Sequence, residues 1–559
     1  MQASSSDWRR RWCIETRAMI RIAMPIVGAN LLAMGMQLTD LMFVGRLGKV
    51  ELGAAALGNT VFYLIHYPLL GAMTAIDTLL ATAWGARNVH AYGDWTQTSL
   101  CVITALCVPT IAVLCFVDEF LLAIGQDQEL SRLAGDFCKQ LVWGLPPYYW
   151  FQVFSKFLQA QHILAPPVYM GVVANLINVL LNWIFIFGPV GMGFRGAPVA
   201  TSLCRWFQLL SAVVYLRVWP DRWRSTRPPQ FLLPMRKLKG LLPGFWKLAG
   251  PGAVMMLIEA WSFEITTLLA GYLGTVELDA HLTVMQLATL SFLSLPFPVA
   301  IASTIRIGNL LGAGDAQSAS DAMYVTFCIC LGFMSICGVI FASCANYLGF
   351  VFTDDAEVVK AAAGIAYIAA LFQLADGGQA AAGGVFRGMG RQGTVATRNF
   401  FGFWVFGIPC GTVLTFAFDT GLAGLWWGLT VGLAVVNTVS MFELMRVDWS
   451  LEVGKAAERA VPCQDENAVV VATAHEIAAE KAEQSATGGS TCAPTGDGCG
   501  QDPNSGKSSA GTRERGSGEL EVCMSGAIVE KLEPEERTRA ATRMLQLAVV
   551  DASKPDPHL

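Results

Sequence analysis

Long apolar runs recur through the first 445 residues of this chain and restrict its fold more than any other feature. Each run holds about 20 mainly apolar residues, the length that an α-helix needs to cross a bilayer. Helices pair their own backbone groups, which cannot stay unpaired in hydrocarbon. The sequence therefore predicts an all-α membrane protein with twelve transmembrane helices. The expected spans are 18–44, 54–82, 96–117, 130–158, 166–188, 196–218, 246–272, 281–304, 322–350, 358–385, 396–417 and 421–444.

The composition argues for a multi-pass membrane protein and against several other classes. Hydrophobic residues make up 54% of the chain and charged residues only 14%, which is too apolar for an ordinary soluble protein. Nothing in the charge distribution supports nucleic-acid binding. The 15 cysteines are scattered, without the spacing of a metal site, so we expect no metal and no cofactor. No cytoplasmic loop gathers His, Asp or Ser residues at catalytic spacing, so we do not expect an enzyme.

The distribution of Lys and Arg predicts the orientation of the chain. The basic residues of segments 9–21 and 217–247, together with Arg306 and the arginines of 387–398, fall on one side of the expected spans. Loops on the other side hold few basic residues and are partly acidic. By the positive-inside rule, both termini are expected to be cytoplasmic.

An internal repeat divides the twelve spans into two halves. The pattern GxLGxVELxA begins at Gly45 and recurs from Gly271, about 226 residues later. Six helices is an even number, so both halves enter the membrane from the same side and the repeat is parallel. Repeats of this kind are related by a pseudo-two-fold axis along the membrane normal, with binding sites near the midplane. We expect two six-helix bundles related in this way.

These features divide the chain into five parts. We expect a cytoplasmic N-terminus over 1–17, a first six-helix bundle over 18–218, a basic cytoplasmic linker over 219–245 and a second bundle over 246–445. The remaining part, 446–559, becomes polar and rich in Gly and Ser, which is typical of disordered segments. It is therefore expected to be a largely disordered cytoplasmic tail.

The span 246–272 carries Glu259 and Glu264 at membrane depth. An acidic residue there costs about 2.5–3.5 kcal/mol on insertion scales, so it usually faces a cavity or a partner and marks a route for ions or substrate. Five residues advance about 140° around a helix, so the two carboxylates cannot share one face. We expect at most one of them to point straight at a central site. The alternative is a neutral carboxyl group that hydrogen-bonds a neighbouring helix.

Arg205 is an unexpected charge near the middle of the span 196–218. Three interpretations are open: the side chain snorkels to the interface, pairs with a carboxylate such as Asp40, or favours an anionic substrate. Structural pairing is the preferred one. Prolines add a second irregularity, because each removes a helix hydrogen bond and marks a helix that can bend. They are Pro68, the pair Pro146-Pro147, and Pro296.

Several motifs, in this order, resemble those of the eukaryotic branch of the multidrug and toxic compound extrusion (MATE) transporters. They are LTDLMFVGRLG, AIDTLLATAWGA, FLQAQ, LLNWIFIFG, IEAWSFE, STIRIGNLLGAG and GGVFRGMGRQG. The resemblance covers about residues 15–445 and leaves the tail outside. It implies twelve helices in two bundles, alternating access, and export of organic compounds coupled to the entry of protons or sodium ions.

The resemblance also implies roles for single residues. The LE-x-W-x-FE motif of such transporters is similar to IEAWSFE here, which makes Glu259 the proton-coupling carboxylate and Glu264 its second acid. The acid of the tenth helix corresponds to Asp376. Eukaryotic members are thought to place their cation site in the second half. We therefore expect Glu259 and Asp376 to share a cavity there.

The first half holds secondary candidates for the site. The family's acids correspond to Asp40 and Asp77, for which gating or loop anchoring is an equal alternative. The Asn/Asp pair of certain prokaryotic members reads Asn178 and Asn182 here, which weakens a first-half cation site. A Glu on the eighth helix of some animal members is Gln286 in this chain. Cavity aromatics that could make cation–π contacts are Trp261, Phe263, Phe372 and Trp404, although a lipid-facing or packing role is preferred for any single one of them.

The sequence as a whole predicts a secondary antiporter that exports organic compounds (organic cations, drugs or secondary metabolites) in exchange for protons. Protons are preferred over sodium because the second-half acids are retained while the first-half pair is neutral. The alternatives are a sodium-coupled exporter and a lipid flippase or scramblase of related architecture. We expect a monomer in the plasma or vacuolar membrane, with a small organic substrate and the lipid bilayer as partners, and no nucleic acid.

Overall fold

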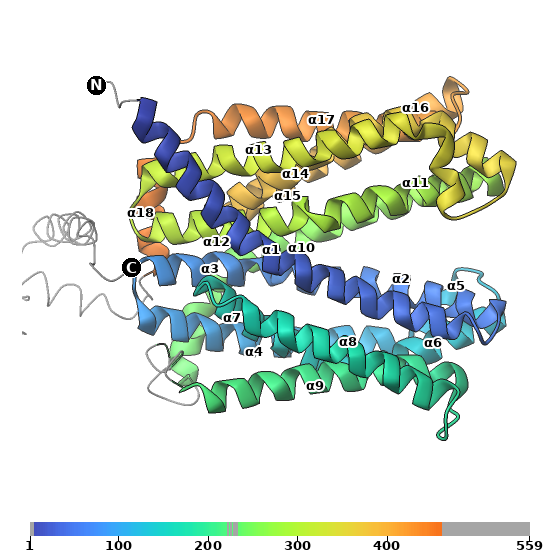
Figure 1. The fold of residues 1–559 in the computed structure, drawn as a ribbon, viewed down its shortest axis with the longest axis horizontal. Helices are drawn as coiled ribbons and strands as arrows, with labels where there is room; N and C mark the ends of the chain where they lie inside the picture. The colour runs from blue at the N-terminus through green and yellow to red at the C-terminus, as the bar shows by residue number, and fades with distance from the viewer. Residues whose placement is uncertain (1–4, 221–222, 224–225, 227–232, 461–559) are drawn as a thin grey trace, which may run out of the picture. The chain divides into compact units, whose positions relative to one another are not determined.

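The computed structural model describes residues 5–220, 223, 226 and 233–460. Within these residues every regular element is a helix and no strand occurs (Figure 1). Eleven helical segments of this described part are long and apolar enough to cross a membrane. The prediction of an all-α membrane protein is confirmed. From residue 461 onward the predicted tail lies outside the described residues.

The first bundle, called the N-lobe here, comprises the helices up to residue 218. They are α1 (Ser5–Val44), α2 (Lys49–Ala72), α3 (Thr74–Gly85), α4 (Val89–Cys115), α5 (Val117–Ala123), α6 (Gln128–Leu141), η1 (Val142–Gly144), α7 (Leu145–Ala160), α8 (Ala165–Ile186), η2 (Gly193–Arg195) and α9 (Gly196–Val218). Helix α8 packs between α1 and α9, and α2 packs on α6.

The second bundle, the C-lobe, repeats this plan from α10 to α17. Its helices and the short helix α18 that follows are α10 (Met235–Leu273), α11 (Thr275–Ser294), α12 (Pro296–Gly312), α13 (Ala316–Ser343), η5 (Ala345–Tyr347), η6 (Gly349–Val351), α14 (Ala356–Gly388), α15 (Gln392–Asn399), the π-helix η7 (Phe400–Gly407), α16 (Ile408–Ala417), α17 (Leu422–Leu444) and α18 (Trp449–Ala460). Helix α14 contacts α13, α12, α17 and α11 and forms the centre of the lobe.

The boundaries differ from the expected ones at three places. Helix α1 begins at Ser5 rather than at residue 18, and α10 begins at Met235, inside the expected linker 219–245. Helix α18 occupies Trp449–Ala460, where a largely disordered tail was expected. Its buried Glu452 pairs with Arg391 at 2.5 Å, a contact that only the folded chain can supply.

Helix breaks occur close to the prolines. The expected span 54–82 is divided at Met73, five residues after Pro68, into α2 and α3. The span 281–304 is divided at Leu295, directly before Pro296. The span 130–158 is divided at η1, before the Pro146 pair. Because proline lacks the N–H that the preceding turn needs, it accounts for the breaks at η1 and Leu295, whereas Pro68 stays inside α2 and the break at Met73 follows it.

The repeated GxLGxVELxA pattern builds the same turn in both lobes. Gly48 and Gly274 are the N-cap residues of α2 and α11, with φ/ψ of 168°/171° and 149°/171°. The N–H of Leu52 donates to the carbonyl of Gly48 at 3.2 Å, and that of Leu278 donates to Gly274 at 3.1 Å. The internal repeat therefore corresponds to a repeated structure.

The lobes meet at the end of the membrane domain that carries α18 and the start of α1, called the α18 end here (Figure 1). Helices α3 and α12 touch through their backbones, since a Cβ atom on Gly85 or Gly312 would overlap the other helix. The hydroxyl of Thr78 donates to the carbonyl of Arg387 at 2.7 Å, and Gln392 donates to Thr78 at 2.9 Å. The α18 end is therefore closed.

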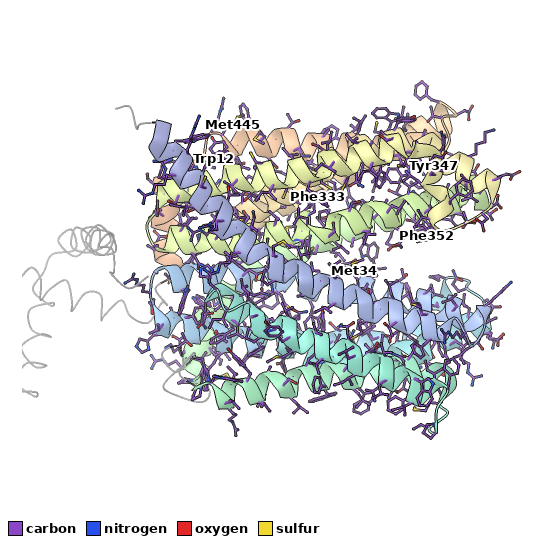
Figure 2. The ribbon with its side chains drawn as sticks, in the orientation of Figure 1. Trp12, Met34, Phe333, Tyr347, Phe352 and Met445 are labelled. Carbon is purple, nitrogen blue, oxygen red and sulfur yellow. The ribbon has the colours of Figure 1, made fainter. Side chains whose placement is uncertain are left out.

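Ion pairs reinforce this closure. On α1, Glu15 accepts two hydrogen bonds from Arg306 of α12, at 2.7 and 2.8 Å. Arg11 pairs with Asp321 of α13 at 2.9 Å. Figure 2 shows Trp12 at this end and Tyr347, 70% exposed, at the opposite end. Aromatic residues at both ends are typical of the two membrane interfaces.

Glycines let α17 pack closely against η7 and α16. The facing glycines are Gly424, Gly428 and Gly432 on α17 and Gly402, Gly407 and Gly411 on its partners. A Cβ atom on Gly428 would lie 2.5 Å from the carbonyl oxygen of Gly407. Small residues of this kind let membrane helices approach at backbone distance, where dispersion attraction holds them together.

We expect Gly428→Ala to lower the free energy of unfolding by about 1–3 kcal/mol, because the added methyl group overpacks the contact. Gly364→Ala is the matched control, since Gly364 lies in α14 and a Cβ atom there would have nothing within 4 Å. That change should be neutral or stabilise by up to about 1 kcal/mol through helix propensity. Thermal unfolding of the purified protein measures both, and equal melting temperatures would contradict the packing argument.

Candidate functional site

Glu259 of α10 accepts hydrogen bonds from two neutral side chains of the C-lobe. Its Oε2 atom accepts from Nε2 of Gln379 at 3.2 Å and from Nδ2 of Asn399 at 3.1 Å. Gln379 is on α14 and Asn399 ends α15, and both are buried. Two consecutive helices, α14 and α15, therefore meet the distant helix α10 at one carboxylate.

Asp376 and Arg387 bring two more charges to this place from α14. Asp376 is 6% exposed and interacts electrostatically with Glu259. Arg387 is 9% exposed and interacts with both Glu259 and Asp77. Eleven residues make about three helical turns, so Asp376 and Arg387 point from the same face of α14. The C-lobe site, as named here, consists of Glu259, Asp376, Gln379, Arg387 and Asn399.

The C-lobe site contains polar atoms with unused hydrogen-bonding capacity. Among the described residues, Oε1 of Gln379 and Oδ1 of Asn399 are buried without a partner. Gln373, one turn before Asp376, is 0% exposed, and neither of its amide atoms has a partner in that part of the chain. Buried polar groups are normally paired, so unpaired ones indicate a place where an ion, water or ligand binds.

A π-helix positions the edge of the site. Asn399 is followed directly by η7, and the indole N–H of Trp404 in η7 donates to the carbonyl of Ile258 at 3.1 Å. This bond fixes the backbone of α10 one residue before Glu259. π-Helical turns are rare and are frequent at functional sites. The apolar run FFGFWVFG that forms η7 carries no sequence signal for it.

Glu264 lies apart from these donors. It is partly exposed and interacts electrostatically with Tyr67 of α2, as Glu259 also does. Tyr67 belongs to the N-lobe, so this part of α10 lies near the boundary between the lobes. The structure brings Glu259 and Asp376 together, and it places Glu264 towards the N-lobe.

In the N-lobe, Asp40 accepts three hydrogen bonds, which involve both of its oxygens. Its Oδ1 accepts from Nδ2 of Asn182 at 2.8 Å and from Nδ2 of Asn178 at 3.2 Å. Its Oδ2 accepts from the hydroxyl of Thr201 on α9. The sequence had indicated Asp40 and both asparagines, while Thr201 was missed because a threonine in an apolar helix is unremarkable.

Asp77 belongs to the closed α18 end. Its Oδ2 lies 2.5 Å from Nζ of Lys156 on α7, and both side chains are largely buried. Lys156 was missed by the sequence analysis, although a lysine in an apolar helix is a detectable signal. The ion pair places Asp77 beside Arg387, at the junction of the lobes.

Several candidates lie away from the C-lobe site. Gln286 is exposed on α11, and Trp261 is 44% exposed on the face of α10 opposite to Glu259. Phe372 is 2% exposed and its ring packs 5.5 Å from that of Trp426, which is the packing role rather than a cation–π contact. Phe263 packs 5.8 Å from Phe403 in the same core. These aromatics stabilise the lobe.

The contacts of Arg205 differ from the expected pairing with a carboxylate. Its guanidinium lies over the rings of Phe62 and Tyr148, at 5.4 and 5.0 Å, rather than in an ion pair with Asp40. Asp40 accepts its hydrogen bonds from Thr201 and two asparagines instead and interacts with Arg205 only at longer range. In the part of the chain that the structure describes, no group of three or more His, Cys, Asp or Glu residues is placed to hold a metal ion.

Comparison with known proteins agrees with the fold. The family model described as MatE matches residues 25–184 and 251–413, one segment in each lobe. Multidrug and toxin extrusion protein 2 of Mus musculus is 31% identical over 460 residues, which are 82% of this chain and 78% of the mouse protein. Protein DETOXIFICATION 16 of Arabidopsis thaliana is 30% identical over 454 residues, which are 80% of this chain and 91% of the Arabidopsis protein.

Solved structures support the same assignment. The eukaryotic MATE transporter AtDTX14 superposes with a TM-score of 0.75 at 28% identity, covering 81% of this chain and 100% of that one. A Vibrio cholerae MATE transporter, at 17% identity, shares the fold with a TM-score of 0.72, over 79% of this chain and 100% of its own. The members of this family are transporters rather than enzymes. This chain is accordingly a multi-pass membrane transporter of the MatE family, the family of the multidrug and toxin extrusion proteins.

Proposed function

We propose that this transporter exports organic compounds by alternating access and that proton binding at Glu259 drives the cycle. The arrangement of the donors carries the proposal. Gln379 and Asn399 both donate to Oε2 of Glu259, and no side chain of the described residues donates to Oε1. One carboxylate oxygen is thus anchored, and the other can receive a proton or the cationic group of a solute.

Competition between proton and solute gives the exchange. A protonated Glu259 is neutral, while an ionised one adds a negative charge that attracts an organic cation. Arg387 and Asp376 also interact electrostatically with Glu259, so one proton on Glu259 makes the net charge of the site more positive by one unit. A ligand shifts a conformational equilibrium only through its different affinity for the two states. A proton and a solute that compete for one carboxylate shift this conformational equilibrium in opposite directions.

The closed α18 end supports an alternating-access cycle. The basic residues predict that this end faces the cytoplasm. In the structure its contacts join α3 to α12 and α14, and the ion pair of Arg306 with Glu15 joins α12 to α1. Opening towards the cytoplasm requires these contacts to break. The breaks at Met73 and Leu295 provide hinges beside them.

Glu259→Gln is expected to abolish transport driven by a pH gradient, because an amide keeps the shape of the side chain but cannot bind and release a proton. Uptake of a cationic dye into proteoliposomes that contain the full chain measures this effect. We expect a fall of at least about tenfold, as for the loss of a charged hydrogen-bonded group.

Glu264→Gln is the matched control on the same helix, and it should retain most of the activity. The melting temperature of each variant shows that it is folded. A Glu259→Gln protein that still responds fully to the pH gradient would contradict the proposed coupling.

A second test separates protons from sodium ions. Asp40 is already held by Thr201, Asn178 and Asn182, so we expect Asp40→Asn to lower stability by about 1–3 kcal/mol while pH-driven transport persists. A sodium gradient alone should move no dye. Sodium-driven uptake that disappears in Asp40→Asn would instead identify the N-lobe as the ion site.

A further inference from the structure

We propose that Arg205 and the rings around it form a subsite that binds the carboxylate group of an aromatic solute. The inference deepens the proposed function and rests on it, because it names a class of substrate for the same transport path. The subsite comprises Arg205 of α9, Phe62, Tyr63 and His66 of α2, and Tyr148 of α7.

Arg205 points into the N-lobe rather than towards lipid. The exposed apolar residues of α9 include Leu203 at 43%, Leu210 at 59% and Val214 at 58%, which lie on one face of the helix. Arg205 is about 140–180° away from these three residues around the axis. Its buried Nη1 and its position over the Phe62 and Tyr148 rings argue against snorkelling to the lipid interface. The charge faces the protein interior, where it needs a partner.

The guanidinium is held by rings and lacks an oxygen partner. Its Cζ lies 5.4 Å from the centre of the Phe62 ring and 5.0 Å from that of Tyr148. Nη1 is buried with no hydrogen-bond partner among the described residues. Asp40 interacts with Arg205 only through space, since its oxygens are occupied by Thr201 and two asparagines. An arginine has five N–H donors, so this one retains capacity for an incoming oxyanion.

The surroundings leave room for the arginine and consist of aromatic rings. Gly144 in η1 faces the side chain, and a Cβ atom there would lie 3.0 Å from Cδ of Arg205. The ring of His66 lies 4.9 Å from that of Tyr63 and 6.4 Å from that of Tyr148. Nε2 of His66 is also buried without a partner in the described part of the chain. A planar aromatic ligand has rings to stack on beside the charge.

The aromatic surface continues towards the C-lobe site. The ring of Tyr67 lies 6.4 Å from that of Tyr63, and Tyr67 interacts electrostatically with Glu259 and Glu264. A positive charge thus lies at one end of the series of rings and two carboxylates lie near the other. The planar guanidinium fork matches the two oxygens of a carboxylate. The geometry therefore favours an aromatic solute whose carboxylate binds at Arg205.

Two dyes that differ in one group test the subsite. Rhodamine 110 has a free carboxylate, and rhodamine 123 is its methyl ester, so the pair changes the anionic group while the rings stay the same. Equilibrium binding to the purified full chain is measured by fluorescence anisotropy without any ion gradient. Arg205→Gln should weaken rhodamine 110 binding by at least about tenfold, the effect of a lost charged hydrogen bond, and rhodamine 123 binding by less than about twofold.

Two further variants separate the effect of the positive charge from that of the planar guanidinium and from a general effect of mutating α9. Arg217→Gln removes an exposed arginine from the same helix and should change neither affinity. Arg205→Lys keeps the positive charge but lacks the planar guanidinium, and it should weaken rhodamine 110 binding by a few fold. If Arg205→Gln does not fold, the affinities of the Arg205→Lys variant for the two dyes test the subsite. Equal effects on both dyes, or none on either, would overturn the subsite.

The test is independent of proton coupling. If binding of rhodamine 110 depends on Arg205 but no pH gradient drives transport, the proton-coupled mechanism fails and the subsite stands. If Glu259→Gln abolishes pH-driven transport while Arg205→Gln leaves the ratio of the two affinities unchanged, the coupling stands and the subsite fails.

Discussion

A carboxylate inside a membrane protein needs donors that the surrounding lipid cannot supply, and the C-lobe is built around this need. Gln379 and Asn399 reach Glu259 from α14 and α15, and the bond from Trp404 to Ile258 holds α10 in register with η7. Removing any of these helices would leave a buried polar group unpaired, which costs about 1–3 kcal/mol and more for a charge. The core of the C-lobe and its site therefore depend on one another.

The two lobes use their acids differently, although they share one repeat. In the N-lobe, Asp40 receives three hydrogen bonds on both oxygens, which suits a fixed structural role. In the C-lobe, both donors of Glu259 act on one oxygen. Unpaired buried amide oxygens occur beside both acids in the described part of the chain, on Asn178 and Asn182 in the N-lobe and on Gln379 and Asn399 in the C-lobe. The C-lobe thus holds a carboxylate with both donors on one oxygen, while the N-lobe holds Arg205, whose buried Nη1 has no hydrogen-bond partner among the described residues.

The contacts between the lobes show how such sites can be exposed in turn. At the α18 end, α3 and α12 approach at backbone distance, and polar bonds from Thr78 and Gln392 cross the junction. Polar and ionic contacts of this kind can be exchanged for water without loss of a packed core. The breaks at Met73 and Leu295 divide the helices that carry the contacts. A closed end that can open is consistent with the transport function of the family.

The sequence by itself determined the helices, the repeat and the acid in α10, because hydrophobic length, small-residue patterns and a charge in an apolar run are local properties of the chain. Tertiary structure decided which of those residues meet. Gln379, Asn399 and Lys156 became part of sites only through contacts between distant helices, and Phe372 became core rather than cavity wall for the same reason. A neutral amide or an aromatic ring in an apolar helix has no local signature of its partner, so only the packing of the lobes reveals it.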